Sequence, residues 1–338
     1  MGVTIKDVAQ AAGVSAKTVS RVLNDSPSVA KETRQAVLGA MNDLKYHPNA
    51  SARSLVLSQT GVVGLAIAYD PRFVFGNPYF SEVIRGINDI CNGEGYNLLV
   101  EARPDTSALT LVRSGKVDGL LYMCTRKDLE LTDELLVRNF PFVLIGRDPD
   151  EERIPSVEVD DELGGYIAGK HLSDLGYRRL GFIGGSREYV SFAQRSAGFM
   201  RALEEAGLSL DKDFVVENEY VSQEEGYQSM HRLLASASRP EAVFVFNDLL
   251  ALGALRALKE KGADLPGDMG IVGFDNIMPT MYCDPPLTTI EQPAYDKGFI
   301  AAQILLKTIR GEDIEDRHLL LRPRLVVRSS CGVNRRSS

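Results

Sequence analysis

One short segment, "GVSAKTVSRVLN" at residues 13–24, carries side chains whose types and spacing suit nucleic-acid recognition. Polar and basic residues recur in it at intervals of three or four: Lys17, Ser20, Arg21 and Asn24. On a helix such residues share one face. Cationic and hydroxyl side chains contact phosphates, and an arginine can donate two hydrogen bonds to one guanine. The alternative is an ordinary solvated helix face.

The distribution of charge favours nucleic acid. The chain of 338 residues has a formal net charge of −8, yet residues 1–60 hold seven Lys or Arg and four Asp or Glu, a net charge of +3. The remainder therefore carries −11. A small basic module on an acidic body indicates that only the module meets a polyanion.

The segment is expected to lie in two short helices joined by a tight turn and followed by a third helix over residues 29–44. Thr4 can cap the first helix and Ser15 the second, while Gly13 gives the turn its backbone freedom. The apolar residues expected to form a small core are Val8, Ala9, Ala12, Val19, Val22, Leu23, Val37, Met41 and Leu44. This arrangement is typical of a helix-turn-helix.

Other chemistries find little support. The cysteines and histidines are dispersed: Cys91, Cys124, Cys283, Cys331, His47, His171, His231 and His318. We therefore expect free thiols, no metal and no cofactor. The run "GGSREYVS" is neither a dinucleotide-binding fingerprint nor a phosphate loop, and no catalytic triad can be assembled. No apolar run approaches the ~20 residues of a membrane helix. These observations predict a cytoplasmic protein that is neither an enzyme nor attached to a membrane.

The segments "TIKDVAQAAGVSAKTVSRVLNDSPSVAKETRQAV" and "YHPNASARSL" resemble the headpiece and hinge of the LacI/GalR family of bacterial transcription regulators. The resemblance continues along nearly the whole chain. It implies that the second helix lies in the DNA major groove, where Ala16, Lys17 and Arg21 reach base edges. The implied phosphate contacts come from Ser15, Thr18, Asn24 and Arg34, and Thr4 and Asn49 are further candidate DNA-binding residues.

The segment "HPNASARSLVLSQT", residues 47–60, is expected to connect this module to the body. Pro48 ends the third helix and Asn49 can cap a new one. A helix this short is unstable alone in water, so a flexible linker is the alternative. The resemblance implies that two hinge helices, one per subunit, fold together in the minor groove, with Leu55 wedged between base steps and Ala52 packed beside it.

From Gly61 onward, apolar runs alternate with helix-like segments. The runs are "VVGLAIA", "YNLLVEA", "VDGLLYM", "PFVLIGR", "RLGFIGG", "VVENEY", "AVFVFND" and "MGIVGFDN". Continuous apolar strands separated by helices predict parallel sheets covered on both faces, and this series is long enough for two. We expect "SVEVDDELGGY" and "LTTIEQPAYD" to cross between them. The expected fold is therefore an α/β body of two doubly wound subdomains, like periplasmic sugar-binding proteins, behind a helical headpiece.

Ligands of open α/β sheets bind outside the carboxyl ends of the strands. The residues that follow the apolar runs are therefore the candidates for effector binding: Tyr79, Phe80, Met123, Thr125, Arg147, Ser191, Arg195, Asn247 and Asp275. Aromatic faces together with Arg, Asn and Asp suit a sugar. We interpret Asp248 instead as the N-cap of the helix that follows it.

Two departures bear on the identity of the effector. Many members of the resembled family have Asp after the fourth strand, whereas this chain has Gly146 and Arg147, which argues against a simple pentose or galactoside. The aromatic-rich "FVFGNPYF" resembles regulators of maltose and other α-glucosides. Phe73 and Phe75 could extend a stacking surface for a disaccharide.

The expected parts are a headpiece at 1–46, a hinge at 47–60, an N-subdomain at 61–160 and 292–322, and a C-subdomain at 161–291 and 323–338. The resulting hypothesis is a repressor of carbohydrate-utilisation genes, which binds a palindromic operator in the nucleoid as a homodimer and is controlled by a sugar in the cleft between subdomains. No heptad pattern follows "LRPRLVVRSS", which favours a dimer over a tetramer. The alternatives are a periplasmic-type sugar-binding protein and a regulator with a non-sugar effector such as a nucleobase.

Overall fold

The computed structural model describes residues 3–332 except 24–25, 47–58, 104–107, 124–128, 147–151, 188 and 237. It divides into two compact units, Met1–Gly61 and Val62–Ser338, which we call the headpiece and the body. Within the described ranges, no helix is both long enough and apolar enough to cross a membrane.

The headpiece is a three-helix unit in which the turn after the first helix is tight. Its helices are α1 (Ile5–Ala11), α2 (Ala16–Leu23) and α3 (Lys31–Asp43). Gly13 has a φ of 65°, a left-handed conformation that glycine adopts without strain. Val8, Val19 and Val37, one from each helix, are fully buried against one another. The predicted helix-turn-helix core is therefore confirmed.

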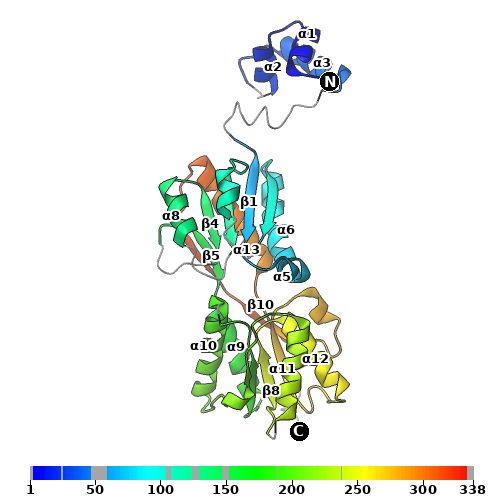
Figure 1. The fold of residues 1–338 in the computed structure, drawn as a ribbon, viewed down its shortest axis with the longest axis vertical. Coiled ribbons are helices and arrows are strands. Elements are labelled where there is room, and N and C mark those ends of the chain that lie inside the picture. The colour runs from blue at the N-terminus through cyan, green and yellow to red at the C-terminus, as the bar shows by residue number, and fades with distance from the viewer. Residues whose placement is uncertain are drawn as a thin grey trace. The chain divides into compact units, whose positions relative to one another are not determined.

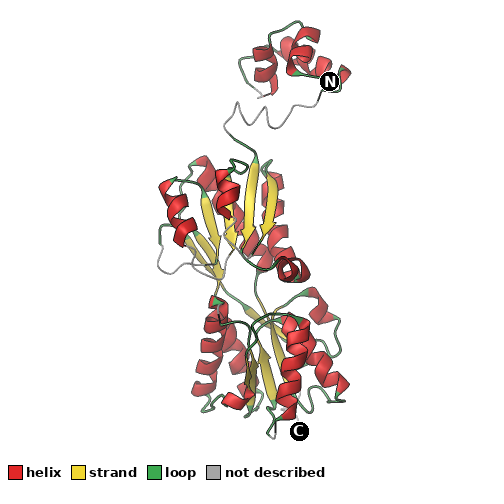
Figure 2. Cartoon of the chain, in the orientation of Figure 1, coloured by secondary structure: helices red, strands yellow, loops and turns green. Residues whose placement is uncertain are grey.

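The first part of the body, which we call the N-lobe, is built on a six-stranded parallel sheet in the order β11-β5-β4-β3-β1-β2. Its strands are β1 (Val62–Ile67), β2 (Asn97–Ala102), β3 (Gly119–Met123), β4 (Phe142–Ile145), β5 (Ser156–Val159) and β11 (His318–Leu321). Its helices are α5 (Pro71–Gly76), α6 (Pro78–Gly93), α7 (Ala108–Arg113), α8 (Leu129–Val137) and α13 (Ala294–Arg310). Helices cover both faces of the sheet (Figure 2).

The second part, the C-lobe, has a six-stranded sheet in the order β12-β10-β9-β8-β6-β7. Its strands are β6 (Leu180–Ile183), β7 (Val215–Val216), β8 (Ala242–Val245), β9 (Gly270–Asp275), β10 (Thr288–Glu291) and β12 (Arg324–Val326). Its helices are α9 (Asp161–Asp174), α10 (Val190–Glu205), α11 (Gln223–Ala235) and α12 (Asp248–Glu260), with short 3-10 turns η1 (Lys212–Phe214) and η2 (Met278–Met281). The edge strand β12 runs antiparallel to β10, whereas the other pairs are parallel.

The eight apolar runs all form strands, so the prediction of two α/β sheets is confirmed. Both predicted crossings are present, since the chain passes between lobes from β5 to α9 and from β10 to α13 (Figure 1). The bounds expected for the two subdomains also require a third passage, between residues 322 and 323, and in the structure the chain passes there from β11 to β12. The two lobes are thus joined by three short segments, and a group at the end of a crossing strand lies close to both lobes.

Candidate DNA-binding surface and ligand site

In the described part of the predicted stripe on α2, Lys17 and Arg21 are exposed and Ser20 is half-buried, and capping interactions stabilise the start of the helix. The Ser15 hydroxyl accepts a hydrogen bond from the Thr18 backbone N–H at 3.1 Å and lies 2.9 Å from the Thr18 hydroxyl, so the predicted cap is present. Lys17 and Arg21 are exposed, while Ala16 is half-buried. Neither cation has a partner among the described residues. Both side chains are therefore free to contact an anionic surface.

Two other candidate DNA-binding residues also stabilise the headpiece. Thr4 precedes α1 and donates both its backbone N–H and its hydroxyl to the Asp7 carboxylate, at 2.8 and 2.7 Å. These hydrogen bonds lower the pKa of Asp7. Arg34 donates to the Ser26 carbonyl at 2.8 Å and so fastens the start of α3 to the preceding loop. The candidates Asn24, Asn49, Ala52 and Leu55 lie outside the described residues.

The candidate ligand residues of the C-lobe converge on one buried ion pair. Arg195 projects from α10, and its Nε donates to Asp161 on α9 at 2.7 Å. Its Nη1 donates to the Phe246 carbonyl at 2.7 Å and lies 3.8 Å from Asp275 Oδ1. The guanidinium also stacks 3.5 Å from the ring centre of Phe274. Arg195 is 5% exposed, so a charged group is held here by anions and aromatic faces together.

Close helix packing places Arg195 beside Asp161. A Cβ on Gly165 of α9 would lie 2.0 Å from the Arg195 carbonyl oxygen, and one on Gly198 of α10 would lie 1.8 Å from the Glu162 carbonyl oxygen. Only hydrogen fits at these two positions. The two helices therefore approach closely enough for the ion pair to form near their crossing.

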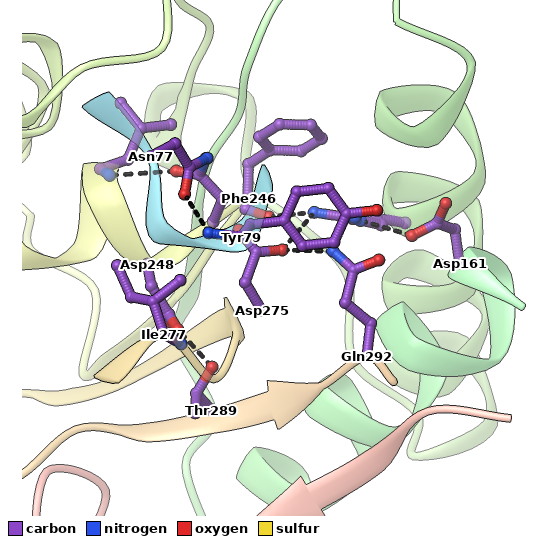
Figure 3. A network of polar contacts seen from close by, with 12 residues as sticks. Asn77, Tyr79, Asp161, Phe246, Asp248, Asp275, Ile277, Thr289 and Gln292 are labelled. Atoms are coloured by element: carbon purple, nitrogen blue, oxygen red, sulfur yellow. Dashed lines mark hydrogen bonds and ion pairs between the residues drawn. The ribbon is translucent and has the colours of Figure 1, made fainter. Parts of the chain in front are cut away.

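Asp275 is the last residue of β9, lies at the start of a constrained loop and has a raised pKa. Its φ is 115° and that of Asn276 is 59°, both in the left-handed region. Gln292, in the crossing after β10, donates to Asp275 Oδ1 at 2.6 Å (Figure 3). Burial raises the pKa of Asp275 to about 6, although Arg195 and Gln292 act in the opposite direction.

Asp248 is not the helix cap predicted from the sequence. Asn247 caps α12 by accepting the Leu250 backbone N–H at 3.0 Å, and Asp248 is the first residue of the helix. The fully buried Asp248 carboxyl accepts the Thr289 hydroxyl at 2.7 Å and the Ile277 backbone N–H at 3.0 Å (Figure 3). Burial, reinforced by the charge of Asp275, raises the pKa of Asp248 well above its usual value. Its observed contacts stabilise the loop that follows Asp275.

The N-lobe contributes Tyr79, whose ring points toward the C-lobe groups (Figure 3). Burial is the largest effect and raises the pKa of Tyr79. The charge of Lys297 lowers this pKa, whereas the charges of Asp275 and Asp161 raise it. The Nζ of Lys297, on α13, donates to this hydroxyl at 3.4 Å. We call Tyr79, Asp161, Arg195, Asp275, Gln292 and Lys297 the interlobe polar cluster.

The other effector candidates have different positions. Phe80 and Met123 lie in the core of the N-lobe, and Phe80 packs edge-on against Tyr79 with ring centres 5.3 Å apart. Ser191 is half-buried in the first turn of α10. Thr125 and Arg147 lie outside the described residues.

Aromatic rings form a second contact between the lobes. Tyr69 follows β1 in the N-lobe, and its ring centre lies 5.8 Å from that of Tyr189, the residue before α10 in the C-lobe. Phe73 packs beside Tyr69 at 5.8 Å, whereas Phe75 is 70% exposed and makes no ring contact with a described residue. Of the two rings expected to stack on a disaccharide, Phe73 belongs to this aromatic contact, whereas Phe75 is exposed and lies apart from it.

Sequence reasoning missed three members of the cluster. Asp161 follows β5 and Gln292 follows β10, so the rule that identified the other candidates applies to both and could have found them. Lys297 lies in the first turn of the helix after β10, but its residue type gives no signal, because a lysine in a helix is usually solvated. The structure thus brings together Tyr79, Arg195 and Asp275 from the predicted set and adds these three.

The cluster has hydrogen-bonding positions that the described residues leave unfilled. Arg195 Nη2, Asp275 Oδ2 and two of the three ammonium donors of Lys297 have no partner among them. Such groups can bind a small polar molecule. No group of three or more His, Cys, Asp or Glu that could hold a metal occurs in the described ranges.

Comparison with known proteins connects both surfaces to one family. Residues 4–49 match bacterial regulatory proteins of the lacI family, and residues 170–331 match a periplasmic binding protein-like domain. The chain is 35% identical over 334 residues to the HTH-type transcriptional repressor PurR of Photobacterium profundum, covering 97% of this chain and 98% of that protein.

Two solved structures are also similar over almost the whole chain. The transcriptional regulator CelR in complex with cellobiose has a TM-score of 0.74 and 31% identity, over 97% of this chain and 99% of CelR. The lac repressor dimer bound to operator and the anti-inducer ONPF has a TM-score of 0.86 and 27% identity, over 98% of this chain and 99% of that one.

Proposed function

Because the chain belongs to the lacI family of bacterial regulatory proteins, we propose that it represses transcription by binding a palindromic operator as a homodimer. It is a DNA-binding transcriptional regulator and not an enzyme. The PurR relatives are repressors, which supports repression, and the lac repressor is a dimer bound to operator, which supports operator binding as a homodimer. We place this activity in the cytoplasm, at the nucleoid.

The observation that carries the DNA-binding proposal is the exposed α2 face. Lys17 and Arg21 lie one helical turn apart, and neither is held by another described residue. In our proposal these two cations and Ala16 contact base edges, while Ser15, Thr18 and Arg34 contact phosphates. Two headpieces related by the dimer symmetry then match two operator half-sites.

We further propose that the interlobe polar cluster binds the effector and that the effector is a carbohydrate. The unfilled donors and acceptors of Arg195, Asp275 and Lys297 suit hydroxyl-bearing ligands, and the nearby rings of Tyr69 and Tyr189 offer apolar faces. The CelR–cellobiose complex supports a sugar. Maltose and other α-glucosides remain candidates.

A nucleobase is the second candidate for the effector. The rings of Tyr189 and Phe246 are nearly parallel, with an interplanar angle of 24° and centres 6.3 Å apart. Flat faces of this kind can stack on a base as well as on a sugar ring.

In the proposed switch, ligand bound by groups from both lobes changes the angle between them. Asp161 and Gln292 are direct continuations of two crossing strands, so a ligand held by their partners acts on the segments that join the lobes. The lobe angle then biases the hinge, residues 47–60, between folded and unfolded states. The hinge includes the proposed minor-groove wedge Leu55.

The test has two stages. Full-length protein is first used to select binding sequences from a pool of random duplex DNA, and we expect a palindrome whose half-sites match the dimer symmetry. Binding of that operator is then measured by fluorescence anisotropy with neutral sugars, acidic sugars, hypoxanthine or guanine added.

A sugar that changes operator affinity supports the complete proposal. If only a nucleobase changes operator affinity, the effector is a nucleobase and not a carbohydrate, and the proposal of a repressor is unaffected. Failure to enrich any sequence would contradict operator binding itself.

A further inference from the structure

Lys297 is a buried cation that forms no ion pair with a described carboxylate. It is the fourth residue of α13 and is only 8% exposed, and it is the only lysine among the buried residues of the described chain. Among the described residues, its ammonium group makes one hydrogen bond, to the neutral Tyr79 hydroxyl at 3.4 Å, which is longer than a good ammonium hydrogen bond. Burying an ammonium costs free energy unless an anion and hydrogen bonds compensate it.

The two carboxylates of the interlobe polar cluster already interact with other groups. Asp161 accepts the Nε of Arg195 at 2.7 Å. Asp275 Oδ1 accepts Gln292 at 2.6 Å and lies 3.8 Å from Arg195. No carboxylate within the described part of the chain lies within 4.0 Å of Lys297 Nζ.

The pKa of Asp275 also indicates that Lys297 lacks a fully paired carboxylate. Two cations, Arg195 and Lys297, lower its pKa, yet burial outweighs them and brings it to about 6. The carboxylate is thus poorly stabilised even with both cations near it. Lys297 and Asp275 therefore do not form a fully compensated pair in the free protein.

We propose that Lys297 anchors an acidic group of the effector, so that the ligand is a carbohydrate bearing a carboxylate or a phosphate. This inference rests on the proposed function, because it assigns a ligand class to the same site. The acidic group accepts the two free ammonium donors of Lys297, and Tyr79 keeps the ammonium in place. A hydroxyl of the same ligand donates to Asp275 Oδ2, which no described residue occupies.

The ligand thereby joins the lobes. Lys297 belongs to the N-lobe helix α13 and Asp275 to the C-lobe strand β9. A sugar with its acidic group at one end and hydroxyls at the other satisfies both sides, whereas a neutral sugar leaves the ammonium without an anion. Lys297 therefore sets the preference for acid over neutral sugar.

The experiment uses matched ligands with the full-length protein. D-Glucose, D-glucuronate and D-glucose 6-phosphate form one series, and the corresponding D-galactose compounds form a second. Dissociation constants are measured by calorimetry. We expect one acid to bind at least about tenfold more tightly than its neutral parent, a difference typical of one charge-assisted hydrogen bond. The uronate and phosphate arms separate the two kinds of acidic group.

Variants then assign the preference to Lys297. Lys297→Met keeps a long, flexible side chain of similar length without charge, and we expect the preference for acid over neutral sugar to fall to about one. Lys297→Arg keeps the charge and should retain most of the preference. Because the methionine has no ammonium to desolvate, the ligand-free Lys297→Met protein should melt at the same temperature as the wild type or higher.

Several outcomes overturn the inference. Equal binding of acid and neutral sugar, or an unchanged preference in Lys297→Met, removes Lys297 as the anchor but leaves a sugar-responsive repressor intact. A melting temperature of Lys297→Met several degrees below that of the wild type would show that Lys297 instead stabilises the fold as a counter-ion. If no sugar of either series binds, both this inference and the carbohydrate part of the proposed function fail.

Discussion

Arg21 is exposed on α2 and has no described partner, so its loss should affect DNA and not the fold. We expect Arg21→Ala to weaken binding of the selected operator by about 1–3 kcal/mol, the discrimination given by one bidentate arginine–guanine contact. Affinity for a scrambled duplex should fall much less. Fluorescence anisotropy on both duplexes at one salt concentration gives the difference.

Lys31→Ala is the matched control because Lys31 is also an exposed headpiece cation but begins α3 and lies outside the stripe. It should change the affinity for operator and scrambled DNA to the same extent. An equal loss of affinity for both duplexes in Arg21→Ala would place Arg21 on phosphates instead of bases.

Asp275 predicts a measurable pH dependence of stability. Its pKa rises from about 3.8 to about 6 on folding, so the folded state favours the protonated carboxyl, and its contribution to stability decreases as pH rises through 6. Asp275→Asn cannot titrate. Between pH 4 and pH 7 the unfolding free energy of the variant should therefore gain about 2–3 kcal/mol relative to that of the wild type.

Urea unfolding of both proteins across this pH range measures the relative change. The absolute offset between the two proteins is irrelevant, because only its change with pH reports titration, both of Asp275 and of the Asp248 carboxyl whose pKa the charge of Asp275 raises. A constant offset would mean that Asp275 keeps its ordinary acidity in the folded protein.

Single residues also mark the limit of sequence reasoning. The carboxyl ends of the strands located Arg195 and Asp275, since topology alone places such residues together. Asn247 and Asp248 were interchanged because both can cap a helix and are adjacent in sequence. Lys297 was missed because a lysine in a helix is usually solvated, and only the packing of α13 against the other elements buries it.

At the scale of elements, the crossing of α9 and α10 controls the position of Arg195. In Gly165→Ala the new methyl group would overlap the Arg195 backbone carbonyl, so the helices must move apart. We expect a loss of about 1–3 kcal/mol of stability, the usual cost of overpacking. The effector response should be lost as well, because the Arg195–Asp161 distance increases. Urea unfolding and operator anisotropy measure the two effects.

Gly93→Ala provides the comparison. Gly93 ends α6, and a Cβ there would meet no atom within 4 Å. This change should leave the effector response intact and stabilise the body by at most ~1 kcal/mol, since alanine favours helices more than glycine does. If Gly165→Ala behaves like Gly93→Ala, close helix packing does not position Arg195.

Strands could be predicted from the sequence where every one of their residues is buried. Strands such as β3, β4 and β8 are buried at every position, and such strands have continuous apolar sequences. β11 and β12 are edge strands with partly exposed, mixed sequences, so periodicity does not separate them from loops. Their pairing depends on partners about 160 and 35 residues away in the chain, which local pattern does not encode.

At the scale of the whole molecule, the proposed function requires two headpieces on one operator. The body is a compact unit with its own cores, so the surface that joins two copies can lie within it. One candidate surface is the turn around η2, where Met278 and Tyr282 are 62% and 75% exposed and Met281 is exposed beside them. Adjacent exposed apolar side chains of this kind are typical of subunit contacts.

If this turn pairs with its copy, Tyr282→Asp should yield monomers, because it buries an unpaired charge on each side of a symmetric contact. Operator affinity should then fall by about 10²–10⁴-fold, since each headpiece binds alone. Effector affinity per protomer should stay unchanged. Val137→Asp adds the same charge to another exposed position, 84% accessible, and should remain a dimer. Sedimentation velocity on both variants gives the oligomeric state. A dimeric Tyr282→Asp protein would move the contact elsewhere, and a monomeric wild type would contradict the homodimer itself.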